Sequence, residues 1–111
     1  MKKLLRPIAK EKFEEGDYVI EGELYSPPRR GSLKIQLRAI YLQISRKHRG
    51  INHIDLITPS NLIPDPSIVI ESFLSKFEQK LNNQNLMYGE DTATKLSDGC
   101  LSVISSLIPI Y

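Results

Sequence analysis

The sequence predicts an α+β protein, in which a small β-sheet packs against two C-terminal amphipathic helices, with a basic element beside them at about 32–49. Three observations indicate this class. The run GDYVIEGELY at 16–25 is typical of a strand. Helical patterns cover 67–82 and about 91–107. At 111 residues, 41% of them hydrophobic, the chain can bury one core without disulfides.

The first twelve residues form a separate basic segment. Five cations fall within it, and Pro7 interrupts any long helix. We therefore predict a basic N-terminal arm at 1–12 and a single α+β domain at 13–111. The arm is expected to be solvated or loosely docked, and contact with phosphates or with an anionic membrane surface is the alternative.

Two short strands are expected to form the sheet. In 16–25, Tyr18 and Ile20 share one face, and Gly22 weakens the strand or marks a bulge. The second strand is INHIDLIT, which runs through Ile54 and Leu56.

The basic element at 32–49 has two interpretations. A helix is favoured, because Ser32 can cap it, Gly50 can end it, and one apolar stripe has helical spacing: Leu33, Leu37, Ile40, Tyr41, Ile44 and His48. A strand is the alternative, because residues 33–38 alternate strictly between apolar and polar. The apolar phase then shifts to Ile40, Leu42 and Ile44, so a strand needs a bulge near Arg38. The strand would make the sheet a three-stranded meander.

The helix over 67–82 has the clearest signals. Asp65 is a favoured N-cap, and Pro66 occupies the first helical position, where proline is preferred. Its predicted core face is Ile70, Phe73, Leu74, Phe77 and Leu81.

The last helix has a second apolar face, and Pro109 stops it. Gly99 in its middle indicates close packing with a neighbour. The predicted core face is Ala93, Leu96, Cys100, Val103, Ile104 and Leu107.

Several enzyme classes have no support in the sequence. No glycine-rich phosphate-binding string occurs, and His48 and His53 are not at the spacing of a helical zinc pair. Cys100 is the only cysteine and is expected in the core, with no activating base beside it. We predict no enzymatic activity, no catalytic residue, no cofactor and no metal site.

The charge distribution predicts a binding protein. No acidic residue occurs between Glu23 and Asp55. The cations of that interval are predicted to bind nucleic-acid backbone rather than stacked bases, because only Tyr25 and Tyr41 are near. These cations are Arg29, Arg30, Lys34, Arg38, Arg46, Lys47 and Arg49.

The alternative function is protein–protein contact, as a self-assembling or adaptor protein, with an acidic protein as a further possible partner. On the favoured helix Ile35 and Leu42 lie opposite the main stripe, so they are predicted to form the interface of a homo-oligomer. The chain shows no apolar run of membrane-spanning or signal-peptide length, and one cysteine fits a reducing compartment, so a cytoplasmic location is expected.

Overall fold

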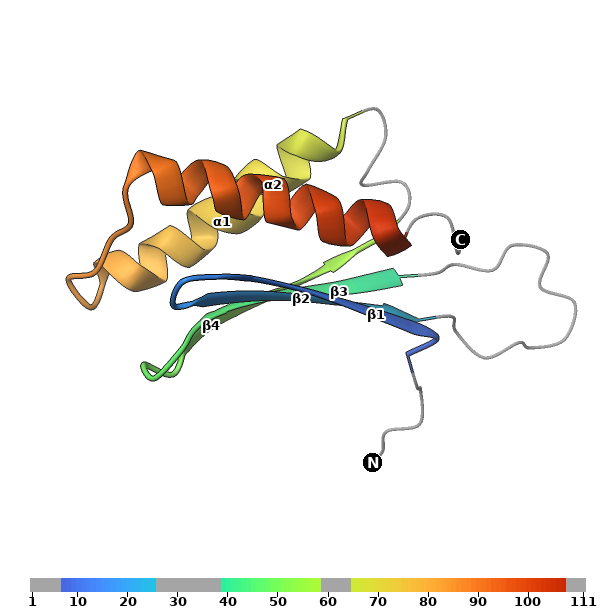
Figure 1. Cartoon of the computed structure of the whole chain (residues 1–111), viewed down its shortest axis with the longest axis horizontal. Coiled ribbons are helices and arrows are strands. Elements are labelled where there is room, and N and C mark those ends of the chain that lie inside the picture. The colour runs from blue at the N-terminus through green and yellow to red at the C-terminus, as the bar shows by residue number, and fades with distance from the viewer. Residues whose placement is uncertain (1–6, 26–38, 59–64, 108–111) are drawn as a thin grey trace, which may run out of the picture.

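A computed structural model describes residues 7–25, 39–58 and 65–107. Within them, four strands precede two helices (Figure 1). The predicted α+β class, with two C-terminal helices packed on a sheet, is confirmed. The elements are β1 (Ala9–Glu15), β2 (Tyr18–Tyr25), β3 (Ala39–Arg46), β4 (Ile51–Ile57), α1 (Pro66–Asn82) and α2 (Glu90–Leu107).

The strands form one antiparallel meander in the order β1-β2-β3-β4. Gly16 (φ 58°) and Gly50 (φ 67°) adopt left-handed backbone in the turns before β2 and β4. In register, Ile20 of β2 lies opposite Ile44 of β3, and Ile44 lies opposite His53 of β4. The cross-strand rows that define the two faces of the sheet follow from this register.

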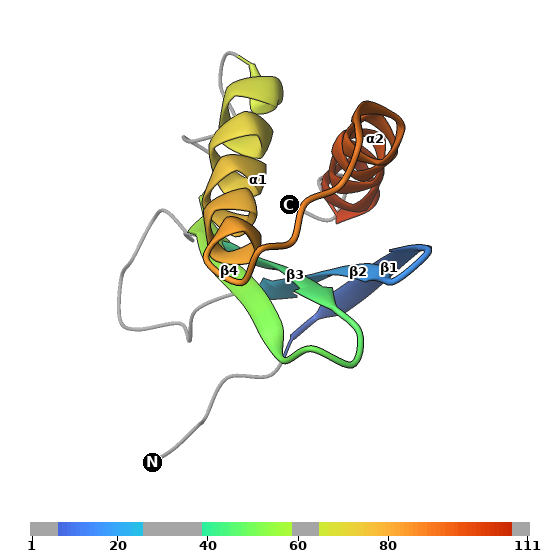
Figure 2. The same cartoon turned by 90° about the vertical axis from the view of Figure 1, so that its left-hand side faces the viewer.

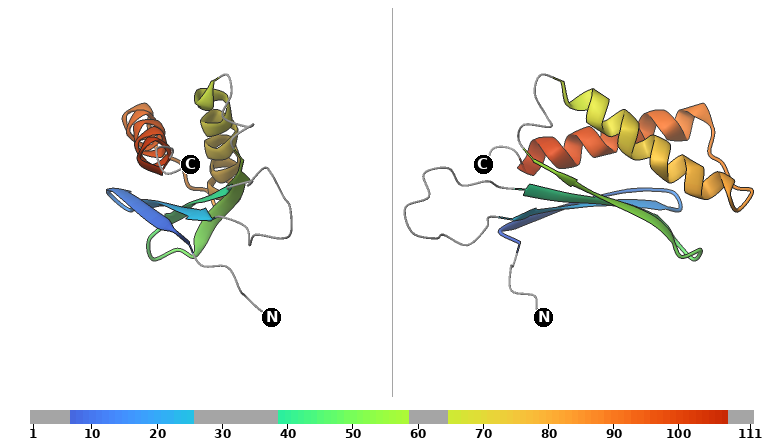
Figure 3. Two further views of the ribbon diagram at one scale, coloured as in Figure 1. Left: turned by 90° about the vertical axis from the view of Figure 1, so that its right-hand side faces the viewer. Right: turned by 180° about the vertical axis from the view of Figure 1, so that it is seen from behind.

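Both helices lie on the same face of the sheet (Figures 1 and 3). Figure 2 shows α1 above β4 and α2 above the side of β1 and β2, as the contacts between these elements also show. The described part of the chain places no helix on the opposite face. We call that opposite face the open face.

The core lies between the sheet and the helices. The face predicted for the first helix is confirmed, because all five of its residues are buried in α1. The last helix also buries its predicted stripe, apart from the half-buried Ala93, and buries Gly99 as well. The sheet contributes its alternate residues: Tyr18, Ile20, Leu24, Ile40, Leu42, Ile44, Ile51 and Ile57.

The predicted start of α1 is also confirmed. The Oδ1 atom of Asp65 accepts a hydrogen bond of 2.9 Å from the backbone N–H of Ser67, and Pro66 is the first helical residue. This bond satisfies one of the helix's unpaired N–H groups.

The sheet has one strand that the sequence did not predict. β1 begins at Ala9, so the last part of the predicted arm at 1–12 is a sheet strand. The alternate residues Ala9, Glu11, Phe13 and Glu15 share one face of β1. Only Ala9 and Phe13 among them are apolar and pack against the core. This weak alternation explains why the strand was missed.

Over 39–46 the favoured helix is wrong, and the chain forms the strand β3 instead. The remaining part of the predicted basic element, 32–38, lies outside the described residues, and 47–49 is a turn. The reason is long-range: β2 and β4 pair with β3 on its two sides and bury Ile40, Leu42 and Ile44 together. Local spacing alone could not report these pairings.

Neither α1 nor α2 is a candidate membrane span, because no described helix combines the required length with sufficient hydropathy.

Candidate binding surface

The open face changes character from one edge to the other. The register places side chains in rows across it, and one row runs Lys10, Glu23, Tyr41, Leu56. The next row runs Lys12, Glu21, Gln43, Ile54. Each row therefore begins with charges on β1 and β2, continues through Tyr41 or Gln43 of β3, and ends with an apolar residue on β4.

The apolar end of these rows consists of Tyr41, Ile54 and Leu56, which we call the apolar patch. These residues are 41%, 52% and 53% exposed, respectively. Tyr41 lies directly opposite Leu56, and Ile54 is next to both on the same face. Contiguous exposed apolar residues occur at contact surfaces, whereas single scattered apolar residues need no explanation.

A second aromatic ring borders the apolar patch. The rings of Tyr25 and Tyr41 meet edge to face, with centroids 5.1 Å apart. The Tyr25 hydroxyl donates a 2.7 Å hydrogen bond to Glu23, and this bond raises the pKa of Tyr25 to about 12. These two rings belong to one shallow hollow that Glu21, Glu23, Gln43 and Ile54 complete.

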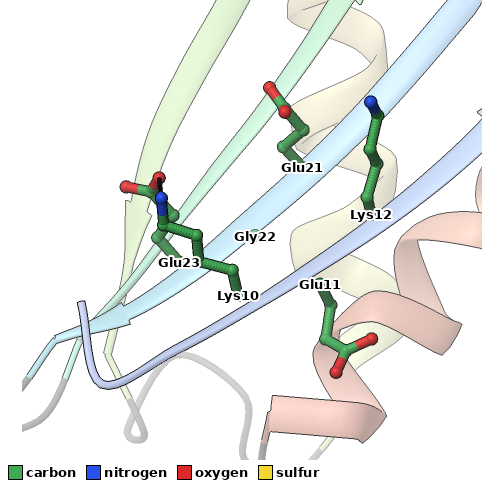
Figure 4. A pocket seen from close by; sticks show the side chains of 6 residues that line it. All are labelled: Lys10, Glu11, Lys12, Glu21, Gly22 and Glu23. Atoms are coloured by element: carbon green, nitrogen blue, oxygen red, sulfur yellow. Dashed lines mark ion pairs between the residues drawn. The ribbon is translucent and has the colours of Figure 1, made fainter.

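The charged end of the rows is balanced rather than basic. Lys10 lies 3.7 Å from Glu23, and Lys12 lies 3.2 Å from Glu14. Figure 4 shows Lys10 reaching Glu23 across the two strands, while Glu11 points to the other side of the sheet. The described part of the open face therefore has no excess of positive charge.

Arg46, one of the predicted nucleic-acid contacts, makes contacts within the fold. Its Nη1 donates a 2.6 Å hydrogen bond to the hydroxyl of Tyr18, and its Nη2 lies 3.5 Å from Asp17. The guanidinium also stacks over the Tyr18 ring at 5.2 Å from the centroid. The Arg46 side chain is only 20% exposed, so it closes the end of the core beside Tyr18.

The other predicted contact residues are dispersed or lie outside the described residues. Lys47 donates a 3.0 Å hydrogen bond to Glu14, which lowers the pKa of that carboxyl, and Arg49 is exposed in the turn before β4. The structure thus does not bring Arg46, Lys47 and Arg49 together as one free cationic face. The predicted residues Arg29, Arg30, Lys34 and Arg38 lie outside the described residues.

The predicted oligomer interface is not supported at Leu42. Its side chain is 0% exposed within a single chain, because it lies on the helix-facing side of β3. A residue enclosed by its own core cannot contact a second copy, so this assignment is corrected. Ile35, the other predicted interface residue, lies outside the described residues.

The backbone hydrogen bonds show which backbone groups of β4 face away from β3. The N–H of Lys47 donates to the carbonyl of Asp17, the residue opposite it in the register of β2 and β3. Hydrogen-bonded and non-hydrogen-bonded pairs alternate along an antiparallel pair of strands, so the odd-numbered residues of β3 are the ones bonded to β2. The even-numbered residues of β3 therefore pair with Ile51, His53, Asp55 and Ile57 of β4. It follows that Asn52, Ile54 and Leu56 direct their N–H and C=O groups away from the sheet.

A contact from α1 agrees with this assignment. The Nζ atom of Lys80 donates a 2.9 Å hydrogen bond to the backbone carbonyl of Asn52, on the side of β4 away from β3. By the same argument, β1 directs the backbone groups of Lys10, Lys12 and Glu14 to its own free edge. The two edges differ, since β1 has charged side chains there and β4 has the uncharged Asn52, Ile54 and Leu56.

Two hollows lie along the β4 edge, between the strand and α1. One is lined by β4 residues and by Ile68, Val69, Ser72 and Lys76; the other by Gly50, Ile51, Asn52, Lys80, Asn83 and Gln84. The α1 residues that line them include two lysines and no carboxylate. Among the described residues that line the first hollow, the acidic one is Asp55 of β4, which lies 3.9 Å from Lys76.

The histidines and the cysteine are at separate positions. His48 lies in the exposed turn after β3 at φ 67°, while His53 packs against Phe73, with ring centroids 5.4 Å apart. Nε2 of His53 lies 3.2 Å from Oδ1 of Asp55 but lacks hydrogen-bond geometry. Cys100 is buried, which raises its thiol pKa to about 12. Within the described residues, no three potential metal ligands come together.

Comparison with known protein families, with curated proteins and with solved structures finds no match to this chain.

The sequence contains a signal for the apolar patch. In a helix, Tyr41 joins a stripe with Ile40 and Ile44. In a strand it alternates with Ile40 and Leu42 and therefore reaches the open face. The alternation in INHIDLI likewise places Ile54 and Leu56 away from the buried Ile51 and Ile57. No sequence signal shows that these residues are neighbours, because that depends on strand pairing.

Proposed function

We propose that this chain is a non-enzymatic protein-binding domain that contacts its partner through the apolar patch and the adjoining edge of β4. The observation that carries the proposal is the contiguous exposure of Tyr41, Ile54 and Leu56 on a face that the helices leave uncovered. Apolar groups bordered by polar and charged groups are the common arrangement of protein interfaces, in which tyrosine is enriched. This is the function expected as the alternative from the sequence, now with different residues.

Selection of a random-peptide display library on the folded chain tests this proposal. Peptides enriched on the wild type should lose binding to the double variant Ile54→Thr plus Leu56→Thr. Threonine retains the β-branched shape that strands favour while it removes apolar contact area. The matched control is Met87→Thr plus Leu101→Thr, at two exposed positions outside the sheet. Peptides that bind the Ile54–Leu56 variant as well as they bind the Met87–Leu101 control contradict the proposal. A selection that enriches no peptide on the wild-type chain contradicts it as well.

A second candidate function is contact with single-stranded nucleic acid, the function first expected from the basic residues. The specific observation that favours it is the pair of rings at Tyr25 and Tyr41 on the open face, with Tyr41 in the row that begins at Lys10. Exposed aromatic rings bordered by cations can stack bases and attract phosphates. The balanced charge of the described open face makes this the second choice rather than the first.

Fluorescence anisotropy with a labelled oligo(dT) strand tests the second function. Loss of one stacked base typically costs about 1–3 kcal/mol, so Tyr41→Ala should weaken binding on the order of tenfold or more, while Tyr41→Phe should retain it. Affinity should also fall steeply as salt is raised. Absence of binding at low salt, or equal binding by the two variants, rules out this function for the open face.

A further inference from the structure

We propose that the free edge of β4 accepts an extended segment of a partner protein as an added strand, and that this segment alternates apolar with acidic side chains. The inference rests on the proposed protein-binding function and specifies the partner's chemistry. The N–H of Asn52 and the N–H and C=O groups of Ile54 and Leu56 are directed to the edge, where an added strand would pair with them, while the Asn52 carbonyl accepts a hydrogen bond from Lys80.

The two edges of the sheet differ in their resistance to such pairing. Charged side chains on an edge strand, lysine above all, discourage the docking of another strand. The free-edge positions of β1 hold Lys10, Lys12 and Glu14, so β1 has this protection. The free-edge positions of β4 hold only uncharged residues, two of them apolar and about half exposed. The structure therefore favours pairing at β4 and not at β1.

The side chains around β4 specify the two faces of the added strand. On the open face, its side chains would lie beside Ile54 and Leu56, where apolar neighbours are stabilising. On the opposite face, its side chains would point toward the α1 flank, where Lys76 and Lys80 lie one helical turn apart. Successive residues of a strand alternate between faces, so the favoured pattern is apolar, acidic, apolar, acidic.

A second copy of this chain fits the edge less well. Antiparallel pairing of β4 with its own copy would bring Lys76 and Lys80 of one protomer toward the same pair in the other. The like charges of these two lysine pairs would repel each other. An acidic segment instead gains attraction from both lysines. The described acidic partner of Lys76 is Asp55, while Lys80 contacts the uncharged Asn52 carbonyl. Lys76, Lys80 and Asp55 together therefore carry a net positive charge.

The test uses fluorescein-labelled synthetic peptides with fluorescence anisotropy. A peptide of alternating Val and Glu should bind the wild-type chain, and an equal-length peptide of alternating Val and Lys should bind much more weakly. The double variant Lys76→Glu plus Lys80→Glu should reverse this preference, with a change on the order of tenfold for each peptide. Lys10→Glu plus Lys12→Glu is the matched control, because it makes the same charge change at the other edge and should keep the wild-type preference.

A further peptide separates strand pairing from simple charge attraction. Methylation of alternate backbone nitrogens in the Val–Glu peptide, at the positions that face β4, removes hydrogen-bond donors without changing charge, and should abolish binding. Binding that survives methylation, no binding of the Val–Glu peptide, or unchanged preference in the Lys76–Lys80 variant overturns the inference. Sedimentation that shows a wild-type dimer held through β4 overturns it as well. None of these results removes the proposed function, which the library selection with Ile54 and Leu56 variants tests separately.

Discussion

The ring of Phe13 in β1 lies against Gly99 in α2 and occupies the space that a Cβ atom at position 99 would fill. This contact joins the first strand to the last helix, and it explains the glycine in the middle of a helix. The weakly patterned β1 thus belongs to the fold rather than to a free arm.

Replacement of Gly99 should therefore destabilise the protein. In an exposed helix position, Gly→Ala gains roughly 1 kcal/mol, but here the new methyl group meets the Phe13 ring, and overpacking of a core typically costs about 1–3 kcal/mol. We expect Gly99→Ala to lower the urea midpoint. The double variant Gly99→Ala plus Phe13→Leu should recover part of the loss. Ser102→Ala, on the exposed side of α2, is the control, and a stabilised Gly99→Ala chain would contradict the packing described here.

Leu42 provides a test of the strand assignment. Because Leu42 is enclosed in the core, Leu42→Ala should cost about 2–5 kcal/mol, and Leu42→Glu should unfold the chain. Gln43→Ala, one position away on the open face, should change stability by less than about 1 kcal/mol. Circular dichroism during urea titration measures both. A folded Leu42→Glu chain would restore the expectation that this side chain is external.

Arg46 should behave as a structural residue. Arg46→Glu removes the hydrogen bond to Tyr18 and places a carboxylate near Asp17, so we expect a loss of about 1–3 kcal/mol. Arg49→Glu, in the exposed turn, should remain within about 0.5 kcal/mol of the wild type. Thermal unfolding of the two variants measures the difference. Equal stability would show that Arg46 is as dispensable for the fold as an ordinary surface cation.

The cap of α1 should make stability depend on pH. The hydrogen bond from the Ser67 N–H lowers the pKa of Asp65 below its ordinary value of 3.8. A lowered folded-state pKa means that the cap contributes fully above the unfolded-state value and is lost as pH falls through the folded-state value. Asp65→Ala should therefore lower the melting temperature at neutral pH, and its difference from the wild type should shrink in acid below pH 3.8. Asp65→Asn can also cap but does not titrate, so this variant should keep most of the stability at both pH values. A wild-type–Ala difference that stays constant across this range would contradict a charged cap.

The helices could be predicted from the sequence because their signals are local. Asp65, Pro66 and the spacing of the buried α1 residues lie within a few turns of one another, so no long-range contact is needed to interpret them. Local signals do not determine the secondary structure of β3, because its apolar residues also fit a helical stripe. The strand follows from pairing with β2 and β4, which are distant in sequence. The candidate surface was missed for the same reason. Tyr41 and Leu56 are distant in sequence and become neighbours only through strand register.

The basic residues illustrate a second limit. A sequence shows that Arg46 and Lys47 are cations, but it does not show that Tyr18 and Glu14 engage them within the fold. Charge counted along a chain therefore overstates the charge that is free for a partner.

Residue-resolved amide hydrogen exchange, measured by NMR, tests the central claim that β4 presents a free edge to a partner. In the chain alone, the amides of Ile54 and Leu56 should exchange quickly, whereas those of His53 and Asp55 should be protected by β3. Addition of the Val–Glu peptide should slow exchange at Ile54 and Leu56 and leave Lys12 and Glu14 on the β1 edge unchanged. Protection of Ile54 and Leu56 in the free monomer, or slowed exchange at the β1 edge in place of β4, would contradict it.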